Sequence, residues 1–488
     1  LARLLANLRA NADSAFGRAH GFARIDSVRA YQSAVPVRRF EQLAPWVDRA
    51  AAGELRVLTC EPVRMFERTS GSTSANKLVP FTQTLLDEIA AATRPWLFDL
   101  YRRCPGLRGT GAYWAISPVT RQAQTTQGGI PIGIDDDREY FCSFARWAIG
   151  QMMAAPSSVA RIESVDRWRF ETCRYLLEAE NLGLISVWSP TFASLLLEAI
   201  ASNLDALLDS IAPRRAQSIR QAIARNGGNI TADALWPRLA LVSCWTDGPS
   251  RGFVAQLRRW FPRTPLQPKG LLATEGVVSF PLWGHDGSVL AVRSHFLEFV
   301  DTEYPSKPPL LAHELRDGMI VSPILTTSGG LYRYHLQDRI RIVGRYRNTP
   351  CIRFEGRLDC ASDLVGEKLD ARVVELAVER ATQRTGKQWQ FAMLAPELGS
   401  PPAYRLYLEG PGSVDEAQAM AAEVESALAQ GAHYAYCRKL GQLGPVRSVQ
   451  VRRAAWALER RQAAEGGRIG ELKPTPLDRR AGWAEFFA

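Results

Sequence analysis

The chain has 488 residues, which is too many for one simple hydrophobic core, so we expect two domains. Hydrophobic residues make up 46% and charged residues 23%, which excludes a disordered protein; no stretch approaches a membrane span, so no membrane partner is expected. The net charge of +10 suggests anionic ligands, but the arginines are spread thinly without interleaved aromatics, so we expect no nucleic-acid binding.

Helical and extended patterns alternate from the N-terminus onward. Residues 1–60 carry leucines at helical spacing, and a helix is predicted over 85–101 with Thr84 as its N-cap. The later expected elements are a strand over 113–117, a helix from Ser189 through Ile200, strands over 239–245, 296–300 and 339–343, a helix near 414–428 and a strand near 448–457. This order predicts an α/β fold with short β segments between about residues 289 and 343.

Cysteine and lysine usage narrows the class of protein. The eight cysteines show no Cys-x-x-Cys pair and no Cys/His spacing typical of a zinc site, which predicts reduced thiols and a cytoplasmic protein. The first residues, Leu1 to Leu5, have the pattern of an amphipathic helix and not of a signal peptide. Only seven of the 60 basic residues are lysines, so a lysine inside a motif indicates a need for a compact point charge.

A small-residue loop between Phe66 and Phe81 carries the first chemical signal. Thr69 to Ser74 are all small, five of the six bear a hydroxyl, and Lys77 follows. Small residues let a backbone approach a phosphate, while hydroxyls and an ammonium donate to its oxygens. The loop is not a Walker A motif, because Asn76 and Leu78 flank the lysine where Gly and Ser or Thr are required. It predicts a phosphate-binding loop of another class; a solvent-exposed Ser/Thr loop is the alternative.

A second short motif matches the nucleophile elbow of serine hydrolases. Gly248, Ser250 and Gly252 fit its Gly-x-Ser-x-Gly pattern. The elbow requires a strained turn between strand and helix with the serine at its tip, and Pro249 restricts the backbone just before that serine. A hydrolase is therefore the less favoured interpretation.

The phosphate loop, extended by Pro80-Phe81-Thr82, resembles the signature of the acyl-adenylating superfamily and most closely its Gretchen Hagen 3 branch of acyl acid amido synthetases. Further segments resemble the superfamily's motifs in the same order along the chain: Trp245–Gly248, Gly270–Gly276, Tyr332–Asp338, Phe354–Asp359 with Ser362–Leu369, and Gly470–Pro474. Four positions depart from the motifs: Ser74 and Gln337 stand where Gly is usual, Asn76 where Pro is usual, and Leu272 where an aromatic is usual.

The resemblance implies a role for each matching residue. The residues expected to bind ATP are Thr69, Ser70, Gly71, Ser72 and Thr73 on its phosphates, Asp247 and Gly248 near adenine, Thr274 on the α-phosphate, and Asp338 and Arg357 on the ribose. Lys77, Glu275 and Lys473 are the expected catalytic residues, with Glu275 also holding Mg²⁺. Lys473 would neutralise charge while the acid attacks the α-phosphate.

The resemblance also implies the fold and the reaction. The fold would be a large N-terminal α/β domain with a β subdomain over residues 1–356 and a small mobile α+β domain over 357–488, and the protein would be a monomer. The reaction would use ATP and Mg²⁺ to convert a carboxylic acid into an acyl-adenylate, which an amine or amino acid then attacks to give an amide. Transfer to coenzyme A or a carrier-protein thiol, or a member that binds nucleotide and acid without catalysis, are the alternatives.

The acid itself is not named by any motif. Trp114, Trp188, Phe192 and the stretch 125–131, which contains Gly129, are candidates to line an acyl pocket. Indole-rich walls would suit an aromatic acid. The alternative is that these aromatic residues form ordinary core.

Overall fold

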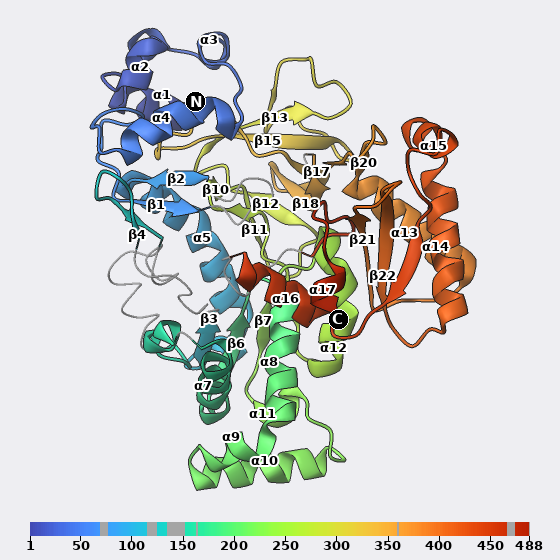
Figure 1. Ribbon diagram of the computed structural model, residues 1–488. Helices are drawn as coiled ribbons and strands as arrows, with labels where there is room; N and C mark the ends of the chain where they lie inside the picture. The colour runs from blue at the N-terminus through green and yellow to red at the C-terminus, as the bar shows by residue number, and fades with distance from the viewer. Residues whose placement is uncertain are drawn as a thin grey trace. The chain divides into compact units, whose positions relative to one another are not determined.

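The computed structural model describes residues 1–68, 77–114, 124–133, 152–162, 164–358, 361–465 and 474–487 (Figure 1). Contacts between residues divide the chain into two compact units. The first consists of Leu1–Trp188, Ala199–Trp245 and Pro262–Phe354, and the second of Ser189–Glu198, Thr246–Phe261 and Glu355–Ala488.

Helices occur in both units, and 3-10 helices are labelled η. The described helices are α1 (Ala2–Ala10), α2 (Ala15–Ala19), η1 (Phe22–Arg24), α3 (Val28–Ala34), α4 (Phe40–Ala51), α5 (Gln83–Arg103), η2 (Pro105–Leu107), η4 (Ser157–Arg161), α7 (Val165–Glu178), α8 (Pro190–Ser202), α9 (Leu204–Asp209), α10 (Pro213–Arg225), α11 (Ala232–Leu235), η5 (Gly248–Phe253), α12 (Val254–Trp260), α13 (Ala371–Thr385), α14 (Val414–Leu428), α15 (Ala432–Lys439), α16 (Ala454–Ala464) and α17 (Ala484–Phe487).

The strands form several separate sheets. The described strands are β1 (Met65–Arg68), β2 (Leu78–Phe81), β3 (Gly111–Trp114), β4 (Gln124–Thr125), β5 (Pro131–Ile132), β6 (Leu182–Ser186), β7 (Leu241–Ser243), β8 (Leu266–Gln267), β9 (Leu272–Ala273), β10 (Gly276–Val277), β11 (Ser279–Pro281), β12 (Ser288–Leu290), β13 (Phe296–Asp301), β14 (Leu310–Leu311), β15 (Ile320–Thr326), β16 (Tyr334–His335), β17 (Asp338–Tyr346), β18 (Thr349–Arg357), β19 (Ala361–Ser362), β20 (Leu369–Asp370), β21 (Phe391–Glu397), β22 (Ala403–Glu409) and β23 (Arg447–Gln450).

Helix α5 connects the N-terminal part of the first unit to its sheets. Its N-cap is Thr82, two residues before the predicted Thr84, because the Thr82 hydroxyl accepts a hydrogen bond from the Leu85 N–H at 3.1 Å. Farther along the helix, Trp96 and Leu100 pack with Leu184 and Leu241 in one buried cluster. The helix therefore covers one face of the sheet that contains β6 and β7.

That sheet is entirely parallel, with strand order β3-β6-β7-β8. Residues Ser186, Ser243 and Gln267 are register partners across β6, β7 and β8, where all three strands end. Because the carboxyl ends of parallel strands meet at one edge, this edge is the expected location of a ligand.

The larger sheet of eight strands has the order β11-β12-β18-β17-β15-β13-β14, with β16 paired to β15. It contains the predicted strands over 296–300 and 339–343, which are confirmed as β13 and β17. Two smaller assemblies accompany it: a four-stranded sheet in the order β2-β1-β5-β4 and the β9–β10 hairpin.

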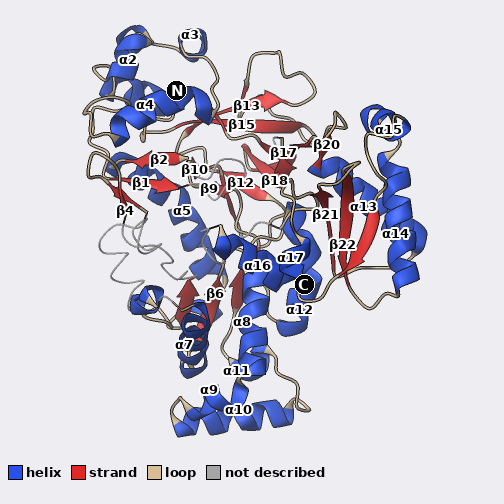
Figure 2. Ribbon diagram, viewed as in Figure 1, coloured by secondary structure: helices blue, strands red, loops and turns tan. Residues whose placement is uncertain are grey.

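The second unit is built around the sheet β21-β22-β23 (Figure 2). Helices α13 and α14 share a buried cluster with β21 and β22 that includes Val374, Leu394, Leu406 and Met420. The predicted helix near 414–428 is confirmed as α14, which begins at a Ser413–Glu416 capping box. The predicted strand near 448–457 is wrong beyond Gln450. Arg453 adopts the left-handed helical conformation, and α16 begins at the next residue.

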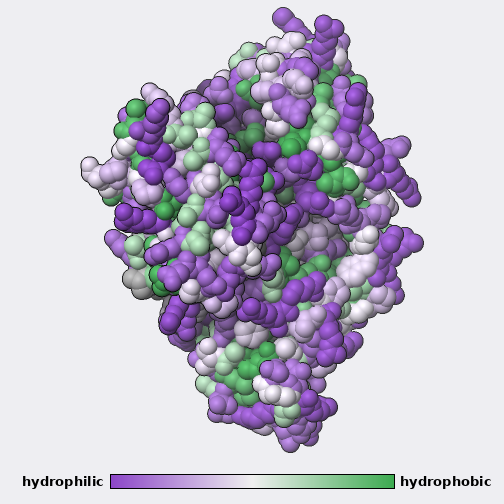
Figure 3. All heavy atoms as spheres, turned by 90° about the vertical axis from the view of Figure 1, so that its right-hand side faces the viewer, coloured by the Kyte–Doolittle hydropathy of each residue, from purple (hydrophilic) through white to green (hydrophobic). Residues whose placement is uncertain are grey.

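Among the described residues no helix is both long and apolar enough to cross a membrane. The face shown in Figure 3 carries mainly hydrophilic side chains, with hydrophobic ones in separate small groups.

Candidate functional site

Two of the predicted nucleotide-binding motifs meet in the first unit. The Tyr334 hydroxyl, in the segment Tyr332–Asp338, donates to Glu275 Oε1 at 3.0 Å. Among the described residues this hydroxyl is the one hydrogen-bond partner of the Glu275 carboxylate, and it leaves the second oxygen open. The contact joins the predicted Mg²⁺ ligand to the strand that leads to the predicted ribose ligand, Asp338.

Glu275 is held by a tight hairpin. Thr274 and Glu275 are the two turn residues between β9 and β10, whose closing pair is Ala273 and Gly276. At Gly276 the backbone has φ +158°, and a β-carbon there would lie 2.8 Å from His295 Nε2. Only glycine fits at this position without displacing the histidine ring, so the ring restricts how the turn can lie.

A buried polar network holds the hairpin from behind. His295 Nε2 accepts a hydrogen bond from the Val277 N–H at 3.1 Å, so the proton lies on Nδ1, which donates to Glu88 Oε2 at 2.9 Å. Glu88 also accepts from the Ser328 N–H at 3.1 Å and hydroxyl at 2.6 Å. His295 and Glu88 are each 2% exposed. Sequence reasoning missed this network, because its members lie far apart in the chain and none is part of a motif.

Asp338 lies at the first position of β17 and is buried. The preceding Gln337 has φ +63°, in the left-handed region that explains why glycine is usual there. With the Gln337 amide oxygen facing Arg39, it accepts hydrogen bonds from Arg39 Nη2 at 3.2 Å and from Nε. This side-chain contact supports a conformation that glycine would adopt without help.

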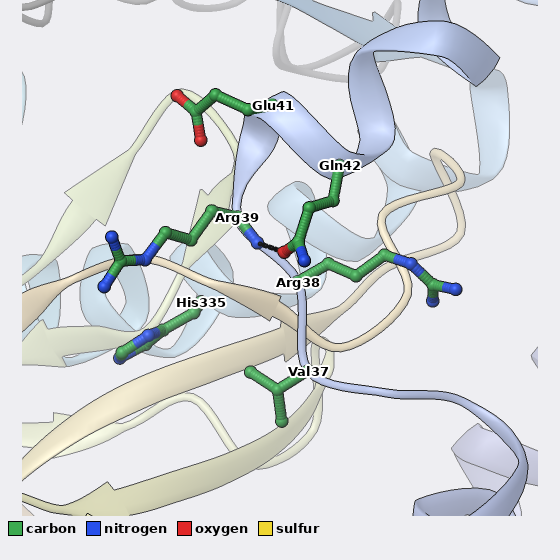
Figure 4. A pocket seen from close by; sticks show the side chains of 6 residues that line it. All are labelled: Val37, Arg38, Arg39, Glu41, Gln42 and His335. Carbon is green, nitrogen blue, oxygen red and sulfur yellow. Dashed lines mark hydrogen bonds between the residues drawn. The ribbon is translucent and has the colours of Figure 1, made fainter.

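A hollow of about 410 Å³ lies beside these residues, between the start of α4 and β16 (Figure 4). It is lined by Val37, Arg38, Arg39, Glu41, Gln42 and His335. Its basic groups already contact protein: Arg38 Nη2 lies 2.8 Å from His20 Nε2, and His335 Nε2 lies 2.8 Å from the Ser322 hydroxyl. Burial lowers the pKa of both Arg38 and His20. The hollow therefore has polar walls but gives no reason to assign it a ligand.

Lys77 immediately precedes β2. Its Nζ lies 3.4 Å from Glu41 Oε1 and 5.6 Å from the centre of the Phe40 ring. The loop residues Thr69, Ser70, Gly71, Ser72 and Thr73 lie outside the described residues. The ends of the loop are joined as a hairpin, because Arg68 pairs with Leu78.

Arg333 has a structural role in the described contacts. Its guanidinium forms a two-bond ion pair with Glu298, with Nε to Oε2 at 3.1 Å and Nη2 to Oε1 at 3.0 Å, and both side chains are buried. Its Nη1 donates to the carbonyls of Gln32 and Val35. The motif that carries Asp338 is thus fastened to the N-terminal helices.

Three further predicted residues lie in the second unit. Asp247 is the N-cap of η5, Gly248 has φ +55°, and Arg357 is the last residue of β18. Ser250 is buried within η5 and not at the tip of a strand-to-helix turn, which does not fit a nucleophile elbow. Lys473 lies outside the described residues.

Trp114 and Trp188 lie around a buried lysine. Lys269 Nζ is 5.7 Å from the Trp114 ring centre, 4.9 Å from that of Trp188 and 5.6 Å from that of Trp96. It donates to the Ser186 hydroxyl at 2.7 Å. Sequence reasoning missed Lys269, although the scarcity of lysine could have drawn attention to a lysine two residues after a strand.

The strand ends beside this cluster carry unpartnered polar atoms. Gln267 Oε1 accepts from Trp96 Nε1 at 2.9 Å, but Gln267 Nε2 and Ser243 Oγ are buried without a hydrogen-bond partner among the described residues. Gly129, also predicted to bind the acyl group, lies in the turn between β4 and β5, where an added β-carbon would meet no atom within 4 Å. Its role stays a prediction.

The described residues contain no group of three or more His, Cys, Asp or Glu side chains that could hold a metal. A Mg²⁺ ion bound through one carboxylate and the substrate's phosphates needs no such group. The open oxygen of Glu275 fits that mode of binding. The six described cysteines are all free.

Comparison with protein families assigns most of the chain. Residues 2–213 match the GH3 family N-terminal domain, residues 288–357 its central domain and residues 372–480 its C-terminal domain. The chain belongs to the GH3 family. The expected resemblance to the Gretchen Hagen 3 branch is thereby confirmed.

Relatives of this GH3 chain occur in animals and plants. A GH3 domain-containing protein of Mus musculus is 27% identical over 289 residues; the match covers 55% of this chain and only 53% of the mouse protein. A probable indole-3-acetic acid-amido synthetase of Oryza sativa subsp. japonica is 23% identical, covering 97% of this chain and 89% of that one.

Solved structures confirm the predicted α/β, acyl-adenylate-forming fold. The AtGH3.15 acyl acid amido synthetase in complex with 2,4-DB matches with a TM-score of 0.86 at 18% identity, covering 100% of this GH3 chain and 92% of that one. A 2-hydroxyisobutyryl-CoA ligase matches with a TM-score of 0.50 at 12% identity, covering 92% and 86%.

Proposed function

We propose that this GH3-family protein is a ligase that activates a carboxylic acid as an acyl-adenylate with ATP and then forms an amide with an amine or amino acid. Its relatives include proteins named as indole-3-acetic acid-amido synthetases and jasmonoyl-L-amino acid synthetases from plants. Family membership and fold support the class of reaction, and the site residues support its individual steps.

One observation carries the proposal. Two motifs predicted separately to bind Mg²⁺ and ribose are joined by the hydrogen bond between Tyr334 and Glu275. A sensor without catalysis has no need for a carboxylate held in this way with one oxygen open. In the proposed enzyme, the Thr274 hydroxyl donates a hydrogen bond to the α-phosphate, and the Asp338 carboxylate accepts hydrogen bonds from both ribose hydroxyls. Glu275 would hold Mg²⁺, which when bound would offset the negative charge of the phosphates.

The reaction has two balanced steps. In the first, a carboxylate oxygen of the acid attacks the α-phosphorus of ATP, the bond to the bridging oxygen breaks, and pyrophosphate leaves. In the second, the amine nitrogen attacks the acyl carbon, AMP leaves with the bonding pair, and the nitrogen loses a proton. We assign charge neutralisation in the first step to Lys473 and Lys77. Residues 69–73 are assigned to the phosphates, Asp247 and Gly248 to adenine, and Arg357 to the ribose.

The acid is assigned to the carboxyl edge of the parallel sheet. Trp114 and Trp188 present indole rings there, which supports an aromatic acid. We further propose that residues 1–356 and 357–488 act as separate domains, with the second rotating between the half-reactions. We place the enzyme in the cytoplasm and propose that it works as a monomer.

Pyrophosphate release from ATP, measured with a panel of aromatic acids, tests the proposal. We expect release that depends on the acid, and an amide product when an amine or amino acid is present. A product that requires a thiol would favour acyl transfer to coenzyme A, and no release with any acid would favour the non-catalytic alternative. Lys473→Ala should reduce acyl-adenylate formation by about 10²–10³-fold but spare amide formation from supplied acyl-adenylate.

A further inference from the structure

The last residues of β6, β7 and β8 form a row of polar side chains. This polar row indicates which kind of acid the protein binds. Its members, Ser186, Ser243 and Gln267, are register partners on adjacent parallel strands, so their side chains emerge on the same face of the sheet. Lys269 and Trp96 contact this row through Ser186 and Gln267. Polar groups, a cation and an aromatic ring thus lie together at the edge where such sheets bind ligands.

Two atoms of the row are buried without partners in the part of the chain that the structure describes. Ser243 is fully buried and Gln267 is 4% exposed, yet Ser243 Oγ and Gln267 Nε2 make no hydrogen bond to a described residue. The acceptor oxygen of Gln267 is already used by Trp96, so the amide nitrogen is the group that lacks a partner. Burying such groups unpaired is costly, and two of them side by side at the ligand-binding edge of a parallel sheet are explained by a ligand that completes the bonds.

We propose that the acid activated by this protein is an aromatic acid that carries an oxygen acceptor on its ring, remote from the reacting carboxylate. Gln267 Nε2, Ser243 Oγ and Lys269 Nζ bind that acceptor, and the rings of Trp114 and Trp188 contact the aromatic body. This inference rests on the proposed function and names the substrate class for it.

The donors suit the remote end of the acid and not the reacting one. Gln267 Nε2 and Lys269 Nζ can only donate, and Ser243 Oγ can donate, so the row favours an acceptor such as a hydroxyl or a second carboxylate. An ammonium bound to the reacting carboxylate would withdraw charge from the attacking oxygen and slow the first step. The same ammonium at the far end strengthens binding without that cost, because hydrogen bonds to charged groups are the stronger ones.

The test compares phenylacetate, 4-hydroxyphenylacetate and 4-carboxyphenylacetate in acid-dependent pyrophosphate release. For the wild type we expect kcat/KM to be about tenfold or more higher for the two substituted acids. Ser243→Ala should reduce this preference several-fold, and Lys269→Met should reduce it most for the carboxylated acid. Ser288→Ala is the matched control, because Ser288 Oγ is also buried and has no hydrogen-bond partner among the described residues, but it lies on β12 in the eight-stranded sheet.

Acid binding without ATP, followed as a rise in melting temperature, separates this inference from the proposed function. Stronger stabilisation by the substituted acids, lost in Ser243→Ala but kept in Ser288→Ala, supports the subsite even if no pyrophosphate is released. In that case the proposed function fails and the subsite stands. Equal kcat/KM for all three acids, or a preference unchanged by Ser243→Ala and Lys269→Met, overturns the inference while leaving the ligase intact.

Discussion

The contact between Tyr334 and Glu275 links two motifs through a single hydroxyl. Without it, the Glu275 carboxylate would be free to rotate at the tip of its two-residue turn. In the proposed function Glu275 holds Mg²⁺, and there the Tyr334 hydroxyl would orient the carboxylate for the ion without itself contacting ATP.

We expect Tyr334→Phe to raise the Mg²⁺ concentration needed for ATP binding by roughly tenfold, since a hydrogen bond to a charged group contributes about 1.5–3 kcal/mol at most and part of it is regained from water. The measurement is ATP affinity by calorimetry over a Mg²⁺ titration. Tyr31→Phe removes a buried hydroxyl that contacts Thr326 and serves as the control. An unchanged Mg²⁺ requirement in a folded Tyr334→Phe protein would show that Glu275 does not depend on this contact.

At the scale of elements, α5, the β9–β10 hairpin and the loop at Ser328 are joined by the Glu88–His295 pair. We expect His295→Phe to destabilise the protein by about 1–3 kcal/mol, because a ring of similar size removes one of the hydrogen bonds to the buried Glu88 carboxylate and leaves the Val277 N–H without an acceptor. Urea unfolding measures this loss, and calorimetry measures the affinity for ATP with Mg²⁺.

A second substitution separates stability from positioning. The double variant Glu88→Gln/His295→Phe removes the buried charge and keeps an acceptor for Ser328, so part of the unfolding free energy should return. The affinity for ATP with Mg²⁺ should stay low, since Val277 beside the Glu275 turn still lacks its acceptor. If affinity recovers together with stability, the pair serves only the core and does not position the hairpin.

Sequence patterns predict a helix or strand correctly where neighbouring residues alone fix its ends. The capping box at Ser413 and Glu416 fixes the start of α14 in the sequence itself, and α14 was predicted with the correct bounds. At α5 two threonines compete for the cap, and Thr82 is chosen because its backbone is extended where β2 ends. The end of β23 depends on the left-handed conformation of Arg453, which no residue pattern signals.

In the candidate site too, the sequence predicts residues within contiguous motifs and misses those that depend on long-range contacts. Glu275 and Asp338 lie in contiguous motifs and were predicted, although their roles stay predictions. The residues that support or extend the site were missed: His295 contacts the hairpin from 18 residues away, and Lys269 reaches Ser186 from 83 residues away. Such contacts depend on which strands lie next to each other in the fold, and no local pattern in a single sequence specifies those neighbours.

At the scale of the molecule, the second unit is assembled from three separate stretches of chain. Phe253, from the middle stretch, packs in a buried cluster with Phe391 and Trp483 from the last one. We expect Phe253→Ala to destabilise this unit by about 3–5 kcal/mol, because it removes a buried ring and leaves a cavity.

Unfolding in urea, followed by tryptophan fluorescence, measures that loss. Leu398→Ala is the control, since Leu398 is 74% exposed and its truncation should change the midpoint little. A midpoint for Phe253→Ala that equals the wild type would mean that the stretch Thr246–Phe261 adds no stability to the unit.

The parallel sheet and the eight-stranded sheet differ in the order in which their neighbouring strands are synthesised. In the order β3-β6-β7-β8 each strand pairs with one that left the ribosome earlier, so this sheet can grow while the chain is being made. In the eight-stranded sheet β12 pairs with β18, so Ser288 can pair only after Ile352 has been synthesised. Nascent or truncated chains that end between these strands expose an unpaired edge along β12, which is a template for association with other chains. Chains interrupted in this interval should therefore aggregate, whereas chains interrupted soon after β8 should not.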